Sequence, residues 1–304
     1  MMKKLMIKET VEILREAGFW VSDCSMVRSC FDVLARRGDT VLLIKLLLNI
    51  EGLGHRSAGE LKSVAAAMSG IPLVVGDHMK NSRLSSDVVY TRYDIHVVGI
   101  EAFAEIVGEK TPLVYSIRGN YCVRINPGLL SDVRRRLGMT QEELASQLGV
   151  SKQSIHRYES SGRVSLDIAE RLMDFLREDL TIPGEVFTSE VKCIEDEVTS
   201  FMTDLKKTVL REFSNMGFET SLTNAPFDIL ASERGHHEKI LTIVSNDRQG
   251  LRRKVEIIRD ISEITGCHKV CISNMSQNLD VLVIKPKELS EINKASEFMK
   301  LLVD

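Results

Sequence analysis

The sequence of 304 residues has no apolar run long enough to cross a membrane. Its most apolar stretch, VLLIKLLLNI at 41–50, is far shorter than the roughly 20 residues of a membrane-spanning helix and contains Lys45. The first residues do not form the apolar core of a signal peptide, because Lys8, Glu9 and Glu12 interrupt it. We therefore expect a cytoplasmic protein without a membrane partner.

The sequence also lacks the paired cysteine spacing of a disulfide framework. Its cysteines are scattered, which is typical of a reducing compartment: Cys24, Cys30, Cys122, Cys193, Cys267 and Cys271. Cys267, His268 and Cys271 form one close group of zinc-ligand types, and His236 and His237 are their possible partners. Zinc ligands usually come as two close pairs, and a second such pair is missing. We expect packed thiols and neither a metal nor another cofactor.

Neither sign of charge is in large excess, since 40 Lys and Arg residues face 43 Asp and Glu residues for a formal net charge of -3. This balance predicts no general attraction to nucleic acid or membranes, so any basic surface is local. Apolar residues make up 43% of the chain and prolines are few, as in an ordinary globular protein. A chain of this length accommodates two or three domains, each with its own core.

Residues 129–163 have the periodicity of three short helices. Leu130, Val133 and Leu137 share one face of the first helix, so they are expected to be buried. Gly138 follows directly, where a glycine commonly ends a helix.

The second and third helices have clear starting signals. Thr140 followed by Glu143 is a capping box, and Ser151 is an N-cap residue. Gly149 lies between the two helices, where a sharp turn favours a residue that tolerates positive φ. The side chains expected in the core are Leu144, Leu148, Ile155 and Tyr158. Three short helices with a tight glycine turn predict a helix-turn-helix.

The spacing of these residues resembles that of the lambda-repressor/Cro-like helix-turn-helix family over residues 127–178. Counted from Gln141, a small residue, Ala145, falls where two helices approach closely, and Gly149 falls at the turn. A glutamine opens both the second and the third helix. The third ends in the family's phrase I-x-x-Y-E-x-x-G at 155–162.

The resemblance implies that the third helix enters the major groove with its N-terminal residues facing base edges. The residues at those positions are Ser151, Lys152, Gln153, Ser154 and Arg157. The amide of Gln153 suits adenine, and the guanidinium of Arg157 suits guanine or phosphate. Gln141, at a helix N-terminus, is expected to contact a phosphate. The resemblance also implies a structural brace between Arg134 and Glu159.

A three-helix unit of this outline also serves as a protein-interaction module, in which Arg134, Arg135 and Arg136 are only a solvated face. The local charge favours DNA binding, because residues 129–163 contain six Lys or Arg and four Asp or Glu in a chain that is acidic overall. A module that binds only another protein is the alternative to DNA binding for this region.

The regions on either side of this unit share a series of sequence phrases. FDVLA at 31–35 recurs as FDILA at 227–231, and VLLIKLL at 41–47 corresponds to ILTIVSN at 240–246. In both regions the predicted order is helix, strand, strand, helix, strand, strand, helix. Continuously apolar strands are typical of a sheet covered on both faces. We therefore predict two α/β domains that arose by duplication.

The aspartate of each FD phrase, followed by a turn and a buried strand, resembles the restriction-endonuclease-like PD-(D/E)xK fold. In active members of that fold an aspartate and a second acid hold Mg²⁺, and a lysine two residues after the second acid assists the attacking water. Asp32 and Lys45 match two of these positions in the first copy, but Leu43 stands at the second acid. We expect Lys45 to pair with Asp32 inside the sheet.

The second copy departs further from the nuclease pattern. Asp228 is present, while Thr242 and Val244 are aligned with the second acid and the lysine. One carboxylate is a poor magnesium site, and the best replacement ligand is Glu60 or Glu256 from the helix that follows. We expect both aspartates and Lys45 to be vestigial and the protein not to be an enzyme. A reused groove for a ligand or a nucleic-acid backbone is the alternative for these domains.

The predicted fold is multidomain, with an all-α helix-turn-helix domain between two α/β, degenerate restriction-endonuclease-like domains. We place the first domain at 1–124, including a linking hairpin at 111–124. The helix-turn-helix domain follows at 125–183, and the second α/β domain occupies 184–304. A long amphipathic helix is expected at 186–216.

The whole arrangement resembles a family of archaeal HTH-type transcriptional regulators. The resemblance implies a sequence-specific regulator that binds double-stranded DNA, with no known effector. We expect a homodimer that pairs through the helix at 186–216 and the flanking sheets, because one short helix reads too few base pairs for a useful specificity. The alternatives are a metal-dependent nuclease of restriction or repair type and an antitoxin-like module that binds a protein.

Overall fold

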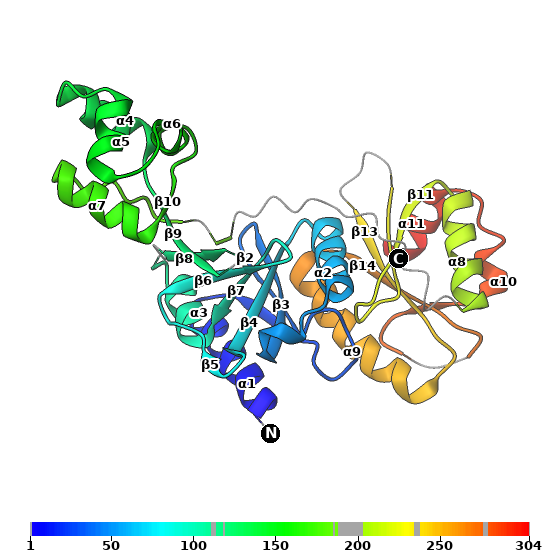
Figure 1. Ribbon diagram of the computed structural model, residues 1–304. Helices are drawn as coiled ribbons and strands as arrows, with labels where there is room; N and C mark the ends of the chain where they lie inside the picture. Colours follow the sequence, from blue (N-terminus) through cyan, green and yellow to red (C-terminus); the bar gives the residue numbers. More distant parts are fainter. Residues whose placement is uncertain are drawn as a thin grey trace. The chain divides into compact units, whose positions relative to one another are not determined.

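The structure is a computed structural model that describes residues 2–110, 114–117, 119–184, 186–187, 203–233, 238–275 and 279–303. The chain forms two compact units, and most of their helices and strands are labelled in Figure 1. Unit 1 comprises Met1–Leu48, Gly52–Leu73 and Glu190–Asp304, and unit 2 comprises Asn49–Glu51 and Val74–Ser189. No helix within the described ranges is long and apolar enough to span a membrane.

Unit 1 begins with a helix, three antiparallel strands and a second helix. These are α1 (Met2–Glu16), β1 (Trp20–Asp23), β2 (Val33–Arg37), β3 (Thr40–Asn49) and α2 (His55–Ala67). The strands lie in the order β1-β2-β3. Gly38 has a φ of 58° at the tight turn between β2 and β3, a conformation that glycine adopts without strain. The middle residues of β2 and β3 are fully buried, as their apolar sequences predict.

The second half of unit 1 is a five-stranded sheet with helices on both faces. Its elements are α8 (Asp204–Asn215), β11 (Phe218–Leu222), β12 (Ile229–Glu233), β13 (Lys239–Val244), α9 (Arg248–Thr265), β14 (His268–Ile272), β15 (Leu282–Ile284), α10 (Pro286–Leu289) and α11 (Ala295–Val303). The strand order is β11-β12-β13-β14-β15, antiparallel up to β13 and parallel beyond it. Phe213, Phe218 and Phe298 pack edge to face between the sheet and the helices α8 and α11.

The two halves of unit 1 pack against each other. Helix α9 contacts β1 and β2 as well as its own strands. The guanidinium of Arg36 donates to the carbonyl oxygens of Ile264 and Thr265 at 3.2 Å, which satisfies the C-terminal end of α9. Asn224 accepts from the backbone N–H of Cys30 at 2.6 Å, which adds a direct link between the two copies.

Before its second helix, each copy has one more strand than the sequence phrases predicted. Strands β1 and β11 pair along β2 and β12 in the same way, with Val21 opposite Ala35 and Thr220 opposite Ala231. The extra strands form because an extended segment before each FD phrase satisfies the free backbone groups of the neighbouring strand. The common order at the start of both copies is therefore helix, three strands, helix.

Unit 2 contains the remaining strands, five α-helices and one short 3-10 helix of the described chain. Its elements are the short 3-10 helix η1 (Ile50–Gly52), β4 (Ile71–Met79), β5 (Ser82–Arg83), β6 (Val88–Arg92), β7 (Ile95–Gly99), α3 (Ile100–Val107), β8 (Val114–Ile117), β9 (Asn120–Arg124), α4 (Pro127–Arg136), α5 (Gln141–Leu148), α6 (Lys152–Ser161), β10 (Arg163–Ser165) and α7 (Leu166–Leu176). Its strands lie in the order β4-β7-β6-β8-β9-β10, and the short β5 pairs with β4 outside this order. Strand β10 was not expected from the sequence.

Helices α4 to α7 enclose a small core that includes Leu130, Val133, Leu144, Leu148, Ile155 and Tyr158. Gly149 and Gly162 end α5 and α6 in the left-handed conformation, with φ of 63° and 65°. The prediction that Leu137 is buried is wrong, since this side chain is 53% exposed. Leu137 is the C-cap of α4, so it lies past the last helical residue and leaves the buried face.

Several sequence predictions fall outside the described residues. The helix predicted at 186–216 is described only from Asp204 onward, as α8. Cys193, His236 and His237 are also outside the described ranges.

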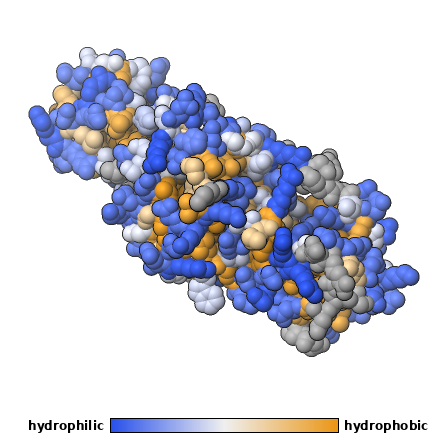
Figure 2. Space-filling model, turned by 90° about the horizontal axis from the view of Figure 1, so that it is seen from below, coloured by the Kyte–Doolittle hydropathy of each residue, from blue (hydrophilic) through white to orange (hydrophobic). Residues whose placement is uncertain are grey.

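The face shown in Figure 2 is largely hydrophilic, with hydrophobic residues exposed in separate patches. Among the described residues Trp20 is the most exposed large hydrophobic side chain. Single exposed apolar residues of this kind are normal for a folded domain.

Candidate nucleic-acid interface and the two aspartate sites

Helix α6 separates a buried face from an exposed one. Ile155 and Tyr158 are buried in the core of α4 to α7. The opposite face is exposed to solvent and carries Lys152, Gln153, His156 and Arg157. At 3.6 residues per turn, positions 153, 156 and 157 form one continuous surface. His156 was not predicted from the sequence to lie on this surface, although its spacing of three residues from Gln153 places it there.

The start of α6 is fixed by its serines. Ser151 Oγ accepts from the backbone N–H of Ser154 at 3.1 Å, and the two hydroxyl oxygens lie 3.0 Å apart. Ser151 and Ser154 were predicted to face DNA, and in the structure both hydroxyls take part in this cap. Lys152 lies 3.5 Å from Glu142 of α5, but both side chains are largely exposed. Such a surface pair contributes little, so Lys152 stays available to another anion.

A buried ion pair joins α4 to the end of α6. Arg134 binds both carboxylate oxygens of Glu159, with Nη2 3.1 Å from Oε2, and also donates to the Met139 carbonyl oxygen at 2.7 Å. Each side chain of the pair is only 8% exposed. A two-point guanidinium–carboxylate contact fixes direction as well as distance. The pair therefore holds α6 at a set angle to α4.

Gln141 is the third member of this brace. Its Nε2 donates to Glu159 Oε2 at 2.6 Å, so its side-chain amide is already engaged. Its predicted phosphate contact then depends on the backbone N–H groups at the start of α5. Burial acts to raise the pKa of Glu159, but the hydrogen bonds from Arg134 and Gln141 outweigh it and hold that pKa below its usual value.

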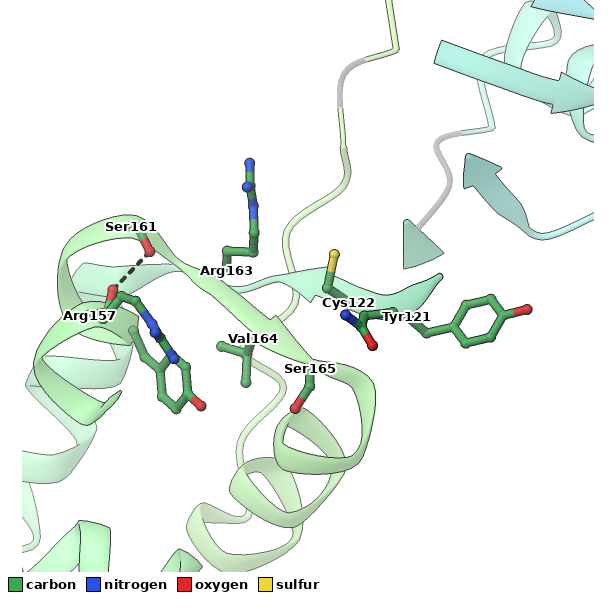
Figure 3. Close-up of a pocket in the computed structure, with 9 residues that line it drawn as sticks. Tyr121, Cys122, Arg157, Ser161, Arg163, Val164 and Ser165 are labelled. Atoms are coloured by element: carbon green, nitrogen blue, oxygen red, sulfur yellow. Dashed lines mark hydrogen bonds between the residues drawn. The ribbon is translucent and has the colours of Figure 1, made fainter. Parts of the chain in front are cut away.

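An open concavity of about 580 Å³ lies between α6 and the strands β9 and β10 (Figure 3). Its lining residues are Asn120, Tyr121, Cys122, Arg157, Tyr158, Ser161, Arg163, Val164 and Ser165. The guanidinium carbon of Arg157 lies 5.5 Å from the centroid of the Tyr158 ring. Of these residues only Arg157 was predicted from the sequence to face DNA, because the pairing of β9 with β10 was not foreseen.

The aspartate of the first copy is neutralised by two lysines. Lys3 Nζ lies 3.0 Å from Asp32 Oδ1, and Lys45 Nζ lies 3.3 Å from Oδ2. The backbone N–H of Leu46 also donates to Oδ2, at 2.8 Å. The expected pairing of Lys45 with Asp32 is thus present, and Lys3 from α1 adds a second positive charge.

The aspartate of the second copy has an equivalent environment built from different positions. Lys206 Nζ lies 2.8 Å from Asp228 Oδ1, and Lys254 Nζ lies 3.0 Å from the same oxygen. The backbone N–H of Val244 donates to Oδ2 at 2.9 Å. Two ammonium groups and one amide thus surround the carboxylate in both copies. No sequence phrase marked Lys206 or Lys254, which come from the helices α8 and α9.

The hydrogen-bond register aligns the two copies residue by residue. The backbone N–H of Asp32 donates to the Ile44 carbonyl oxygen at 2.8 Å, and that of Asp228 donates to the Thr242 carbonyl oxygen at 2.9 Å. Thr242 therefore corresponds to Ile44, which is one residue past the acid position of Leu43.

The sequence alignment of the second copy was thus wrong by one residue. Leu241 stands at the second acid position and Ile243 at the lysine position, and both are fully buried. The error arose because the connection after FDILA is longer than the one after FDVLA, and matched phrases do not set strand register. A shift of one residue moves a side chain to the other face of the sheet.

The helix carboxylates considered as replacements do not reach the aspartates. Glu60 accepts from Arg56 at 3.1 Å and from the Asn224 side chain at 2.9 Å, and Glu256 is exposed. Within the described ranges no group of three His, Cys, Asp or Glu residues is placed to hold a metal ion.

Two family models match separate parts of the chain. One described as a PD-(D/E)XK superfamily domain matches residues 3–113, and one described as a helix-turn-helix matches residues 130–182. A protein of Methanocaldococcus jannaschii is 30% identical over 310 residues, which cover 98% of this chain and 96% of that relative. Its name is "Putative HTH-type transcriptional regulatory protein". The chain belongs to this family.

Other members of the HTH-type regulatory family match over the same length. A relative from Haloarcula marismortui is 28% identical, and one from Methanocella arvoryzae is 29% identical, each over 100% of this chain and 97% of its own. No solved structure matches the chain. The family models, together with the observed sheets and helices, confirm an N-terminal α/β region of nuclease type and a helix-turn-helix in the middle of the chain.

Proposed function

We propose that the protein is a sequence-specific transcriptional regulator that reads the major groove of DNA with α6. The observation that carries the proposal is the exposed face of this helix, with Gln153, His156 and Arg157 side by side on a helix that the core holds from behind. This is the geometry by which a helix-turn-helix presents side chains to base edges. The regulator names of the full-length relatives support the same conclusion.

Each exposed side chain suits a defined contact. The amide of Gln153 both donates and accepts, as adenine requires, and the fork of Arg157 matches the two acceptors of guanine. Lys152 stands at the start of the helix, where its ammonium suits a guanine or a phosphate. The contacts with bases are the ones that confer sequence specificity.

The brace from Arg134 to Glu159 makes this reading surface rigid. It connects the first helix of the unit to the far end of α6, and Gln141 ties in α5. Base contacts lose strength quickly when the donor shifts, because hydrogen bonds depend on distance and angle. Preorganisation by the brace therefore raises affinity without any contact between the brace and DNA.

The α/β domains serve as a scaffold and do not cut nucleic acid. Neither aspartate fits a magnesium site, because the carboxylate oxygens accept from lysines and backbone N–H groups. Leu43 and Leu241 occupy the second acid positions, so a second carboxylate ligand is absent there. Mg²⁺ prefers several oxygen ligands, which these sites do not supply.

The proposed regulator has three domains along the chain, and we include their bounds in the proposal. It places the helix-turn-helix at 125–183 between α/β domains at 1–124 and 184–304, the second of them a degenerate copy of the first. The similar surroundings of Asp32 and Asp228 support the duplication. The active form is a homodimer that binds a palindromic site, because two reading helices are needed for useful specificity.

Selection of genomic fragments by the purified full-length protein tests the proposal. A regulator enriches a few fragments that share a palindromic sequence, and that sequence competes far better than random duplex. Enrichment of no fragment over the input library contradicts sequence-specific binding and favours a protein-interaction module.

A further inference from the structure

Strands β9 and β10 pair at the edge of the unit 2 sheet, and the two faces of this strand pair, called the ribbon below, differ in character. Val123 and Val164 are paired across the ribbon and are buried in the core of α4 to α7. The neighbouring pair, Arg124 opposite Arg163, points the other way because side chains alternate along a strand. Figure 3 shows the Arg163 side chain on the opposite side of the ribbon from Val164. Both arginines are exposed.

Two arginines directly opposite each other are unfavourable without an anion. Their Cβ atoms are about 5 Å apart in an antiparallel pair, and like charges at that separation destabilise a sheet. No ion pair with a carboxylate is formed by Arg124 or Arg163 among the described residues. The sequence around β9 adds no compensating charge, since residues 111–131 contain no Asp or Glu. Within the described part of the chain the ribbon therefore presents a positive pair without a carboxylate partner.

The ribbon is fixed to the end of the reading helix. Gly162 caps α6 in the left-handed conformation, and its carbonyl oxygen accepts from the backbone N–H of Ile125 at 2.8 Å. Strand β10 starts at the next residue, Arg163. An added Cβ at Gly162 would collide with the Ile125 carbonyl oxygen, so helix and ribbon approach as closely as glycine permits. The arginine pair is thus held at a fixed offset from the base-reading face.

We propose that Arg124 and Arg163 on the ribbon bind backbone phosphates of the DNA duplex whose bases α6 reads. A guanidinium matches a phosphate with two parallel hydrogen bonds, and a phosphate beside the pair relieves its mutual repulsion. Arg124 comes from the strand that precedes the helix-turn-helix, outside the residues matched by either family model. This inference rests on the proposed function and adds a second DNA-contacting element to it.

The test compares salt dependence of DNA binding by the full chain and by Arg124→Ala/Arg163→Ala. Each phosphate contact contributes about 0.9 to the slope of log K against log salt concentration. We expect the slope of the double variant to be smaller in magnitude by roughly one to two times this value. The double variant should bind specific and random duplexes more weakly, and the fold-loss of affinity should be the same for both. Arg124→Lys/Arg163→Lys keeps both charges and should restore most of the slope. Arg171→Ala, an exposed arginine of α7, is the matched control and should leave the slope unchanged.

The outcomes separate this inference from the proposed function. A wild-type chain that prefers no site refutes sequence-specific reading, but the slope on random duplex still tests the ribbon. A double variant with the wild-type slope and affinity overturns the ribbon contact, whether or not a specific site exists. Inorganic phosphate that binds the DNA-free wild type but not the double variant, with DNA binding unaltered, also overturns it and identifies a small-anion site instead.

Discussion

Asp228 is the residue whose loss should most disturb the second α/β domain. Its carboxylate is 6% exposed and contacts Lys206 at 2.8 Å and Lys254 at 3.0 Å, while the two lysine side chains are 16% and 26% exposed. Asp228→Asn keeps the shape of the side chain but removes the negative charge between two ammonium groups. Breaking a buried ion pair by removing one partner costs about 3–5 kcal/mol. Because both lysines retain some solvent, we expect about 3 kcal/mol.

Hydrogen exchange of the β12 and β13 amides in the full chain measures this loss. A multidomain chain does not unfold in one step, so a local probe is needed. A loss of about 3 kcal/mol accelerates exchange by roughly two orders of magnitude, since each 1.4 kcal/mol is tenfold. The control is Asp204→Asn, because the Asp204 side chain is fully exposed and its ion pair with Lys207 lies on the surface. That variant should exchange like the wild type.

Two results would refute the reasoning. Exchange in Asp228→Asn that matches the control would show that the lysines lose nothing when the carboxylate is removed. The second result concerns the triple variant Asp228→Asn/Lys206→Met/Lys254→Met. If its amides exchange as fast as those of Asp228→Asn alone, unpaired positive charge is not the cause of the destabilisation. Replacement of a whole buried charge cluster by apolar groups often leaves the stability unchanged, so we expect this triple variant to regain slow hydrogen exchange.

Three further predictions concern the brace, the nuclease-like sites and assembly. Glu159→Gln should destabilise α6 at neutral pH, as measured by hydrogen exchange of the α6 amides. Because the pKa of Glu159 is lower in the folded than in the unfolded protein, the wild type should be more stable than the variant above the unfolded pKa of about 4.3. This difference in stability should vanish as the pH falls through the folded pKa. Plasmid, single-stranded and branched DNA should stay intact in Mg²⁺ or Mn²⁺, and cutting that disappears in Asp32→Ala/Glu60→Ala would reverse that conclusion. Sedimentation should give a dimer, and a monomer with an asymmetric footprint would count against the palindromic site.

Local signals predicted the helix-turn-helix well. The capping box from Thr140 to Glu143 and the left-handed Gly149 were readable from short-range rules, because caps and turns depend on neighbouring residues. The burial of Ile155 and Tyr158 followed from helical spacing in the same way. Helix ends were less secure, as the exposed Leu137 shows.

Long-range features were beyond the sequence. The pairing of Arg163 with Arg124 joins residues 39 positions apart, and no periodicity within either segment indicates it. The lysines around Asp228 come from α8 and α9, so their convergence depends on the packed fold. Strand register in the second copy failed for the same reason. It is set by hydrogen bonds between strands rather than by the phrases within them.

The central claim is that the exposed face of α6 reads base sequence. The most direct measurement is the affinity of wild type, Arg157→Ala and Arg171→Ala for the selected site and for each of its single base-pair substitutions. We predict that substitution of the base pair that Arg157 contacts weakens binding of wild type and of Arg171→Ala by about 1–3 kcal/mol. Arg157→Ala should bind the parent site more weakly by a similar amount and lose discrimination at that base pair alone. An Arg157→Ala profile identical to the wild-type profile at every position, with a Gln153→Ala profile that is also unchanged, would contradict the claim.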